Sequence, residues 1–443
     1  MSIPIRHPGA PDHAPVDATR WPDVAVPPVG RTVPARARAA EGLFRRATDR
    51  LDIRVEYPDG TLGGRRHSVV QPRMIIRRPD ALWRRIGSGG LIGFGEAFMA
   101  GDWTTDDLVG VLTAFAERPG DLVPRSLQWL RAATLPRHPL SEENTTANTR
   151  NNIARHYDLS NELFASFLDD TMSYSSALFD QTLRGSGRPG WSDLATAQHR
   201  KIDRLLDLAG VGPGTRLLEI GTGWGELCLR AAARGATVRS VTLSSEQRDL
   251  ARARVEAAGH ADRVQIDLLD YRQVDGVYDA VVSVEMIEAV GQRYWSTYFQ
   301  TIDRVLAPGG RVAIQAITMP HDRLMASRNT YTWVHKYIFP GGQLTSIDGL
   351  RDVAAESTSL RLTETGAMGL HYAETLRLWR ERFLGNADEV LCLGFDQTFL
   401  RMWQFYLAYS EAGFRSGYLD VHQLLFTRGA GSVGNGPAGR SRR

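Results

Sequence analysis

A glycine-rich turn after a short apolar run holds the residues best suited to binding a ligand. Residues 215–225 read T-R-L-L-E-I-G-T-G-W-G, and the apolar run 217–220 is typical of a strand buried on both faces of a parallel sheet. Gly221, Gly223 and Gly225 follow it and precede a helical pattern. Glycines let the backbone turn sharply and approach a ligand without a Cβ in the way.

Glu219 stands two residues before the first of these glycines, and its charge discriminates among nucleotide-like ligands. The pattern E-x-G-x-G-x-G differs from G-x-G-x-x-G, the fingerprint of dinucleotide-binding proteins. A ligand with a positive ammonium group suits a carboxylate here better than a pyrophosphate does. The pattern therefore predicts S-adenosylmethionine (SAM) rather than NAD, with Glu219 accepting from the ammonium group.

Strand and helix patterns alternate after residue 190. Helices are expected at 192–209, 226–234, 245–258 and 294–306, with strands between them. This alternation predicts an α/β fold, a doubly wound parallel sheet, whose ligands sit beyond the carboxyl ends of the strands. An aromatic-rich insertion interrupts it at 319–345, and residues 371–411 are expected to be helical.

The next strand ends supply candidates for the rest of a SAM pocket. Thr242, Leu243 and Gln247 lie where the ribose is expected, although the acid usual at that point is missing, because the strand ends in T-L-S-S. Asp270 and Tyr271 are placed to hydrogen-bond and to stack on adenine.

Two carboxylates close together in V-E-M-I-E are candidates for the chemical step. Glu285 and Glu288 are three residues apart and share a face if a helix starts there. One would be a structural acid with a buried partner and the other an active-site anchor, and we favour Glu288 for the site. The absence of N-P-P-Y here, and of a cysteine at a suitable strand end, argues against nucleic-acid methylation.

Composition describes a globular protein of two or three domains. The chain has 443 residues, 42% of them hydrophobic. It has no apolar run of about 18 residues and no apolar segment of secretory type at its start, so we expect a cytoplasmic protein. Cys228 and Cys392 are its only cysteines, which excludes a disulfide framework, and no metal is expected.

Five segments are expected along the chain. Residues 1–41 form a disordered arm, 42–117 a small α+β domain associated with lipid or membrane, and 118–148 a linker. Residues 149–428 form the catalytic domain and 429–443 a flexible tail. Within 149–185 an aromatic helix is expected, either as a lid over the site or packed on the sheet.

Arginine is concentrated near the start of the chain. Residues 31–90 hold 14 arginines and no lysine against 6 acidic residues, an excess of eight positive charges. Such an excess is typical of a nucleic-acid or anionic-membrane surface. A general preference for arginine explains it equally well, because Lys201 and Lys336 are the only lysines of the whole chain.

Several motifs together resemble the cyclopropane-fatty-acyl-phospholipid synthase family. They are H-Y-D-L-S-N-E-L-F (156–164), L-L-E-I-G-T-G-W-G, V-T-L-S-S-E-Q, S-V-E-M-I-E-A-V-G, Y-I-F-P-G-G and H-Y-A-E-T-L-R-L-W, within a similarity that covers roughly residues 42–428. More narrowly, A-I-Q-A-I-T-M-P and L-A-Y-S-E-A-G-F-R-S-G-Y-L-D-V resemble the actinobacterial branch that makes 10-methylene and 10-methyl (tuberculostearic) acyl chains.

The resemblance implies methyl transfer from SAM to a cis double bond of a phospholipid acyl chain, with a carbocation that bound bicarbonate deprotonates. The family's bicarbonate ligands fall on Ser176, Glu288, Gln315, Ile317 and Tyr372. Two depart from the commoner pattern, since serine replaces cysteine and glutamine replaces histidine, although both can still donate to an anion. Further residues assigned to the cofactor are Tyr174, Ser175 and Trp224.

The timing of proton loss decides the product. Immediate loss closes a cyclopropane ring, whereas a preceding hydride shift gives a methylene branch, which a separate reductase would convert to a methyl branch. The narrower resemblance favours the methylene branch. Aromatic side chains would face the cation or line an acyl tunnel: Tyr174, Tyr331, Trp333, Tyr337 and Phe339.

This scheme implies two partners. One is a membrane with unsaturated phospholipids, to which the protein would bind peripherally at the inner face of the cell membrane, and the other is a further copy of the chain in a possible homo-oligomer. No nucleic-acid partner is expected. Two other hypotheses remain at this point: a SAM enzyme for a small soluble nucleophile, and a scaffold without activity that keeps the fold.

Overall fold

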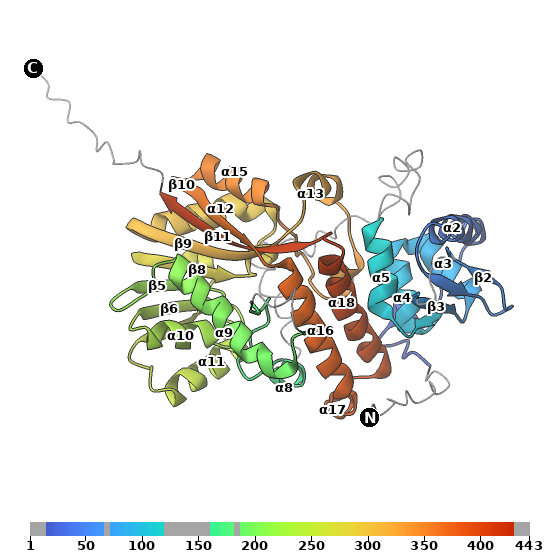
Figure 1. Ribbon diagram of the computed structural model, residues 1–443, viewed down its shortest axis with the longest axis horizontal. Coiled ribbons are helices and arrows are strands. Elements are labelled where there is room, and N and C mark those ends of the chain that lie inside the picture. Colours follow the sequence, from blue (N-terminus) through green and yellow to red (C-terminus); the bar gives the residue numbers. More distant parts are fainter. Residues whose placement is uncertain (1–14, 66–70, 119–159, 181–186, 429–443) are drawn as a thin grey trace, which may run out of the picture.

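The computed structural model describes residues 15–65, 71–118, 160–180 and 187–428. Figure 1 shows a large sheet flanked by helices, a smaller N-terminal domain, and two long helices between them. Apart from Arg118, the expected linker lies outside the described residues, as does the expected tail at 429–443.

The N-terminal domain combines helices with a small sheet, as expected for an α+β unit. Its strands pair in the order β2-β1-β3-β4, with β1 and β3 parallel. Its elements are α1 (Pro22–Ala25), α2 (Val33–Thr48), β1 (Arg54–Glu56), β2 (Leu62–Gly63), β3 (Arg73–Ile76), α3 (Pro79–Gly89), α4 (Leu91–Ala100), β4 (Trp103–Thr105) and α5 (Leu108–Glu117).

The disordered arm predicted for residues 1–41 is wrong where the structure describes it. Helix α1 and most of α2 lie within it, and Val24 is only 1% exposed. Helix α2 buries Ala37, Ala40 and Phe44, which share one face at helical spacing. Alanines form much of that face, so the segment looked like low-complexity sequence although it forms a packed helix.

The large sheet has the strand order β10-β11-β9-β8-β5-β6-β7. The parallel core expected from the alternation is present in β5 (Arg216–Ile220), β6 (Thr237–Thr242), β7 (Val264–Leu268), β8 (Tyr278–Val284) and β9 (Leu306–Thr318). Successive side chains are buried on opposite faces, since Leu217 and Leu218 belong to different core clusters.

Helices cover both faces of this sheet, which confirms the doubly wound architecture (Figure 1). One face packs against α9 (Trp191–Leu208), α10 (Glu226–Ala233) and α11 (Ser245–Ala257). The other packs against α12 (Trp295–Val305) and α15 (Ile347–Ser357).

One strand departs from the predicted parallel sheet. Strand β11 (Asp420–Arg428) lies between β9 and β10 (Leu360–Ala367) and is antiparallel to both. Helices α16 (Gly369–Gly385) and α18 (Gln397–Arg415), joined through α17 (Ala387–Cys392), pack against each other. The chain therefore leaves and re-enters the sheet at its carboxyl edge, which reverses the last strand.

The long helix expected within 149–185 is not present in the described residues. Helix α8 spans only Asn161–Ala165, capped by the Ser160 side chain, and residues up to 159 lie outside the described part. Phe164 and Phe167 are fully buried against the aromatic rings of Trp403. Of the two alternatives, a lid or a packed segment, the described residues therefore show a segment packed in the core, against Trp403 of α18.

Candidate active site

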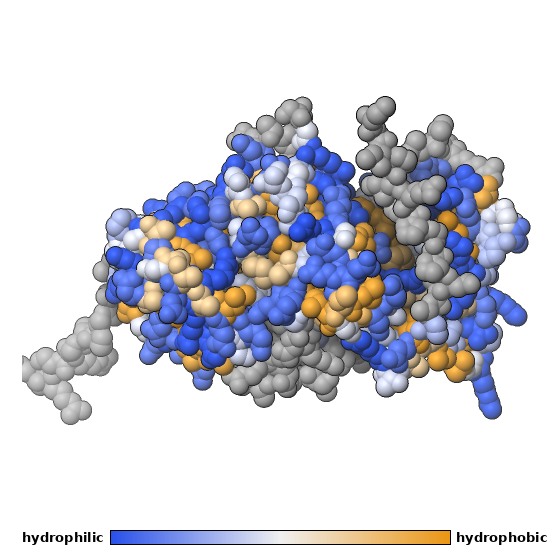
Figure 2. All heavy atoms as spheres, turned by 90° about the horizontal axis from the view of Figure 1, so that it is seen from below, coloured by the Kyte–Doolittle hydropathy of each residue, from blue (hydrophilic) through white to orange (hydrophobic). Residues whose placement is uncertain are grey.

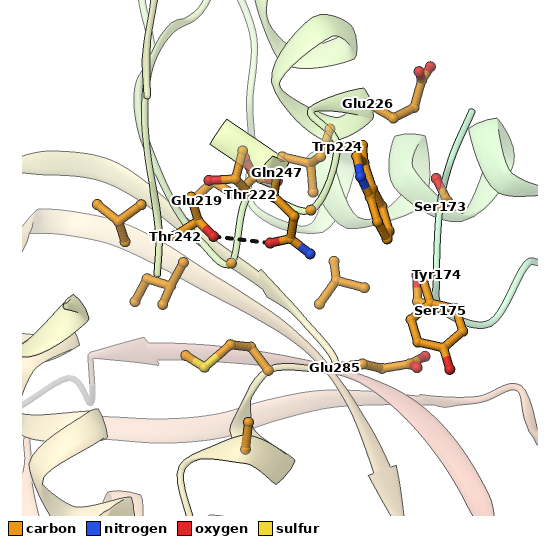
Figure 3. Close-up of a pocket in the computed structure, with 18 of the residues that line it drawn as sticks. Ser173, Tyr174, Ser175, Glu219, Thr222, Trp224, Glu226, Thr242, Gln247 and Glu285 are labelled. Atoms are coloured by element: carbon orange, nitrogen blue, oxygen red, sulfur yellow. Dashed lines mark hydrogen bonds between the residues drawn. The ribbon is translucent and has the colours of Figure 1, made fainter. Parts of the chain in front are cut away.

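A cavity opens at the carboxyl ends of β5, β6 and β8, where the α/β architecture places ligands (Figure 3). Its floor includes Gly221 and Gly223, which have φ angles of +99° and +51°. Residues with side chains other than glycine rarely adopt these angles. The irregular segment 172–175 forms the opposite wall, so the glycine turn and this segment enclose a shared space.

Most residues predicted to bind the cofactor line this cavity: Tyr174, Ser175, Glu219, Gly221, Gly223, Trp224, Thr242, Leu243, Gln247 and Tyr271. The structure does not bring two predicted residues to its wall. Gly225 begins α10 with a φ of +90°, and a Cβ there would lie 3.0 Å from the Ala251 Cβ, so it permits close packing of α10 on α11. The Asp270 carboxylate instead pairs with the Arg272 guanidinium at 2.6 Å.

Glu219 lies at the floor of the cavity and is 3% exposed. Its Oε2 accepts hydrogen bonds from Ser240 Oγ at 2.6 Å and from Cys228 Sγ at 2.8 Å. Burial raises the pKa of this carboxyl to about 7, although both hydrogen bonds lower it. A cation bound in the cavity would favour the ionised carboxylate, in keeping with the predicted ammonium contact.

The residues of this cavity fit SAM. A Cβ at Gly223 would meet nothing within 4 Å, so the backbone there is open to a close ligand. Thr242 donates to the Gln247 side-chain oxygen at 3.0 Å, which leaves the Gln247 amide nitrogen directed into the cavity (Figure 3). The lining thus combines polar groups with the ring of Tyr271 and apolar side chains.

Glu285 closes the far end of the cavity, beside Tyr174 and Ser175 (Figure 3). Its Oε1 accepts from the Ser176 backbone N–H at 2.9 Å and from Gln315 Nε2 at 2.8 Å. Its Oε2 accepts from the Tyr372 hydroxyl at 2.7 Å. A carboxylate surrounded by donors and facing a cavity can act as a base.

The backbone at Glu285 is strained. Its φ is +48°, in the left-handed region that a side chain with a Cβ disfavours by about 1–2 kcal/mol. The Glu285 N–H donates to the Gln315 carbonyl oxygen at 2.8 Å, which helps to hold this conformation. Such outliers cluster at functional sites, where the surrounding structure maintains them.

Glu288, which we favoured as the site carboxylate, is not among the residues that line the cavity, whereas Glu285 is. Glu288 belongs to a 3₁₀ turn (Ile287–Ala289) rather than to an α-helix, so the two acids do not share a helix face. Its Oε1 accepts from the Ile317 N–H at 2.5 Å, and its buried Oε2 has no hydrogen-bond partner among the described residues. Burial, and then repulsion from Glu285, raises the pKa of Glu288 to about 8.

Bicarbonate does not fit this arrangement as it stands. Three of its five predicted ligands, Ser176, Gln315 and Tyr372, donate to Glu285, and a fourth, Ile317, donates to Glu288. A further anion beside Glu285 would meet a like charge, and two unit charges 4 Å apart repel by about 4 kcal/mol at an effective dielectric constant of 20. The donor set is therefore already used by carboxylates of the chain.

A buried polar network holds the Gln315 amide in one orientation. Gln423 of β11 lies opposite Gln315 of β9, and its Nε2 donates to the Gln315 side-chain oxygen at 3.1 Å. The Gln315 nitrogen must then face Glu285. Lys201 of α9, 1% exposed, donates to Ser175 Oγ at 2.5 Å, and its charge favours the ionised form of Glu285. Burial lowers the pKa of Lys201 to about 8.

Of the five aromatic side chains predicted to face a cation or line a tunnel, Tyr174 alone is among the residues that line the cavity. Its hydroxyl lies 2.7 Å from that of Tyr406, whose ring packs edge-on against Phe339. Trp333 and Tyr337 instead pack on the N-terminal domain, where the Tyr337 hydroxyl donates to Glu96 at 2.9 Å.

Tyr331 stacks with its ring on that of His335 of helix α14 (Trp333–Tyr337), within the aromatic insertion. The insertion also contains α13 (His321–Ser327). These contacts show packing for Tyr331 rather than a place in the cavity wall.

Sequence reasoning missed several residues of the cavity, among them Lys201, Arg272 and Met286. Lys201 had a signal that was available, since a lysine in a chain almost free of lysine sits on the expected helix 192–209. Arg272 follows the predicted adenine residues directly, but nothing in its position alone distinguishes it from a surface arginine.

Comparison with known proteins agrees with this fold. Residues 144–424 match the family model for mycolic acid cyclopropane synthetase. The chain is 57% identical over 415 residues to tuberculostearic acid methyltransferase UfaA1 of Mycobacterium tuberculosis, covering 94% of this chain and 97% of the relative. It is 32% identical over 360 residues to cyclopropane-fatty-acyl-phospholipid synthase of Escherichia coli K12, covering 80% and 87%.

Solved structures of this family resemble the catalytic domain. The cyclopropane synthase MmaA2 of Mycobacterium tuberculosis matches with a TM-score of 0.57 at 28% identity, covering 62% of this chain and 97% of that one. The mycolic acid cyclopropane synthase CmaA1, complexed with SAH and CTAB, matches with a TM-score of 0.56 at 29% identity, covering 62% and 97%. With the SAM-type cavity at its strand ends, the chain belongs to the mycolic acid cyclopropane synthetase family and is a SAM-dependent methyltransferase.

Proposed function

We propose that the protein transfers the methyl group of SAM to the cis double bond of an unsaturated, oleoyl-type acyl chain in a phospholipid. The product is a 10-methylene branch, the precursor of a 10-methyl chain. The observation that carries the proposal is the 57% identity, over nearly the whole chain, to a tuberculostearic acid methyltransferase.

The end of the cavity supports this chemistry. An alkene is a weak nucleophile, so the protein must align it and stabilise the cation that follows. When bound, SAM supplies a methyl group on a positively charged sulfur. The ring of Tyr174 and the carboxylate of Glu285 lie together where the cavity ends, and both favour a positive charge nearby (Figure 3).

The alternative product is a cyclopropane ring formed from the same cation. The relative from Escherichia coli is named as a cyclopropane synthase, and it is less similar to this chain than the methyltransferase is. Both routes need one methyl donor and one base. The methylene route also needs a hydride shift before the proton is lost, and a separate reductase would then complete the methyl branch.

Acyl-chain analysis tests the choice of substrate. The protein is incubated with SAM and oleoyl-phospholipid vesicles, and matched vesicles of saturated phospholipid are the control. The acyl chains of the unsaturated vesicles are expected to gain the mass of one CH₂, and the saturated chains none. Mass gain on the saturated chains, or methylation of a soluble acceptor in place of lipid, would contradict the proposal.

We further propose that the protein acts in the cytoplasm and meets the inner face of the cell membrane peripherally. Within the described residues, no helix is long and apolar enough to cross a bilayer. Helix α2 at the end of the molecule exposes Arg36, Arg38 and Arg46, which suit an anionic lipid surface (Figure 1). Figure 2 shows a mostly hydrophilic face with separate apolar patches and an apolar hollow toward the N-terminal domain.

Vesicle co-sedimentation tests the membrane contact. Each basic residue near an anionic surface contributes about 1 kcal/mol, so changing these three arginines to glutamate is expected to weaken binding at least about tenfold. The matched control changes Arg263, Arg293 and Arg361, which are exposed on the catalytic domain. Binding that is indifferent to salt and to anionic lipid would contradict the proposal.

A further inference from the structure

Glu285 occupies the position where the resemblance leads one to expect a bound anion. The Ser176 N–H, the Gln315 amide and the Tyr372 hydroxyl converge on its two carboxylate oxygens at 2.7–2.9 Å. A carboxylate has about four lone-pair sites, so these donors fill three and leave room on Oε2. Because Glu285 also lines the cavity, that remaining site is available to a hydrogen of the substrate.

The backbone conformation indicates that this placement is specific. Glutamate at a φ of +48° is rare, because glycine is the residue that adopts such angles easily. The chain nevertheless carries a long acidic side chain here, folded onto donors from three separate segments: Ser176, Gln315 of β9 and Tyr372 of α16. Strain that the surrounding structure maintains in this way is typical of functional residues.

We propose that the Glu285 carboxylate, and not a bound bicarbonate ion, is the base that removes the proton after methyl transfer. This assignment rests on the proposed function. It makes Glu285 a catalytic residue and Ser176, Gln315 and Tyr372 positioning residues that act through it. A base within the chain replaces a diffusible ion at the same donors.

The step balances without a further reactant. The π electrons of the acyl double bond form the new bond to the methyl carbon while the bond from that carbon to the sulfonium sulfur breaks, and the bonding pair leaves with sulfur as a neutral thioether. A cation remains on the neighbouring acyl carbon, and a hydride shift from the methylated carbon moves it to that carbon. After the hydride shift, a C–H bond of the new methyl group breaks, and its electron pair forms the exocyclic double bond. The proton passes to Oε2 of Glu285, which becomes a neutral carboxyl and returns the proton to solvent before the next turnover.

The charges around Glu285 favour its ionised form before the step. The Ser176 N–H and the Gln315 amide nitrogen can only donate, so they stabilise a carboxylate over a carboxylic acid. The buried ammonium of Lys201 acts in the same direction. Burial raises the pKa of both Glu285 and Glu288, and repulsion from Glu285 raises the pKa of Glu288 further, whereas hydrogen bonds and Lys201 lower that of Glu285.

The test compares Glu285→Gln and Glu285→Gly with the wild type, in buffer freed of carbon dioxide and in buffer with added bicarbonate. Product formation on oleoyl-phospholipid vesicles and the Kd for SAM are measured separately. Glu364→Gln, which removes an exposed carboxylate on β10, is the matched control. Because SAM binding needs a folded cavity, it shows whether each variant is intact.

The wild-type rate is expected to be the same in both buffers. Glu285→Gln is expected to lose at least about 100-fold in turnover in both, as for the loss of a general base, with the Kd for SAM changed less than threefold. Glu285→Gly frees the three donors and suits the positive φ, so bicarbonate is expected to restore part of its activity.

Three results would overturn the assignment. They are a wild type that stops without bicarbonate, a Glu285→Gln variant that remains active, and a Glu285→Gly variant that binds SAM but is not restored by bicarbonate. A wild type that binds SAM and makes no lipid product in either buffer would overturn the proposed function itself, and this assignment with it. Dependence on bicarbonate, by contrast, would leave the proposed function standing.

Discussion

The hydroxyl group of Tyr372 contacts the carboxylate that we propose as the base. Its hydroxyl donates to Glu285 Oε2 at 2.7 Å, from a side chain that is 6% exposed. Its pKa is well above the ordinary value of tyrosine, first because of burial and then because of Glu285, so it donates as a neutral hydroxyl. Removing it would free Oε2 from its only described donor while the carboxylate stays in place.

Tyr372→Phe is therefore expected to lower kcat about 10- to 100-fold, since a hydrogen bond to a charged group contributes about 1.5–3 kcal/mol. The base works when ionised, so activity falls as the pH drops through the pKa of Glu285, which burial raises above 4.5. Loss of a donor raises that pKa further and moves the acid limb of the kcat profile to higher pH.

The matched control is Tyr278→Phe, which removes a hydroxyl that donates to the Asp275 carbonyl at 2.8 Å, at the start of β8 and away from the cavity. It should leave kcat and its pH profile unchanged. Equal loss of SAM binding and turnover in Tyr372→Phe would show that the residue shapes the cavity and does not position the base.

At the scale of single residues, the sequence predicts the cofactor cavity better than the base. The strand, the glycine turn and the strand ends place eight predicted residues around one cavity, because the topology of parallel sheets fixes that edge. The choice between Glu285 and Glu288 depends on a left-handed residue and a 3₁₀ turn. Neither can be inferred from spacing that assumes an α-helix.

At the scale of elements, the N-terminal segment is held by a buried ion pair. Arg85 of α3 and Asp102, 1% and 0% exposed, lie 2.9 Å apart. The Arg85 guanidinium also donates to the carbonyl oxygens of Asp23 and Val24 in α1. One side chain thus connects α1, α3 and the start of β4, which explains why the described part of the expected arm packs on the domain.

Asp102→Asn is expected to destabilise the protein by about 3–5 kcal/mol, because it leaves a buried guanidinium without its counter-charge. The control Arg84→Gln breaks the pair of Arg84 with Asp80, 35% and 80% exposed, and should cost about 1 kcal/mol or less. Thermal unfolding measures both. Similar losses in the two variants would mean that the buried pair does not hold this domain.

Helices and parallel strands of the catalytic domain follow from local patterns, so their predicted bounds agree closely with the observed ones. Helix α9, for example, spans Trp191–Leu208 against a predicted 192–209. The direction of β11 does not follow, because it depends on the packing of α16 against α18, which brings the chain back to the edge of the sheet that it left. The helical face of α2 was missed because alanine carries little hydropathy signal.

At the scale of the whole molecule, the aromatic insertion joins the two domains. Lys336 of α14 donates to the Glu96 carboxylate of α4 at 2.6 Å, and Glu96 also accepts from Tyr337. A Cβ at Gly95 would lie 2.5 Å from the Trp333 ring, so that glycine permits contact between helices. Contacts between residues 240 apart in sequence leave no local pattern that would predict them.

The structure of the product tests the account most directly. The protein is incubated with oleoyl-phospholipid vesicles and SAM that carries ¹³C in its methyl group, and the recovered acyl chains are analysed by NMR. The account predicts that the labelled carbon appears as an exocyclic alkene CH₂. Labelled ring CH₂ would contradict the methylene branch and make the protein a cyclopropane synthase. Acyl chains without label, under conditions in which SAM binds, would contradict lipid methylation altogether.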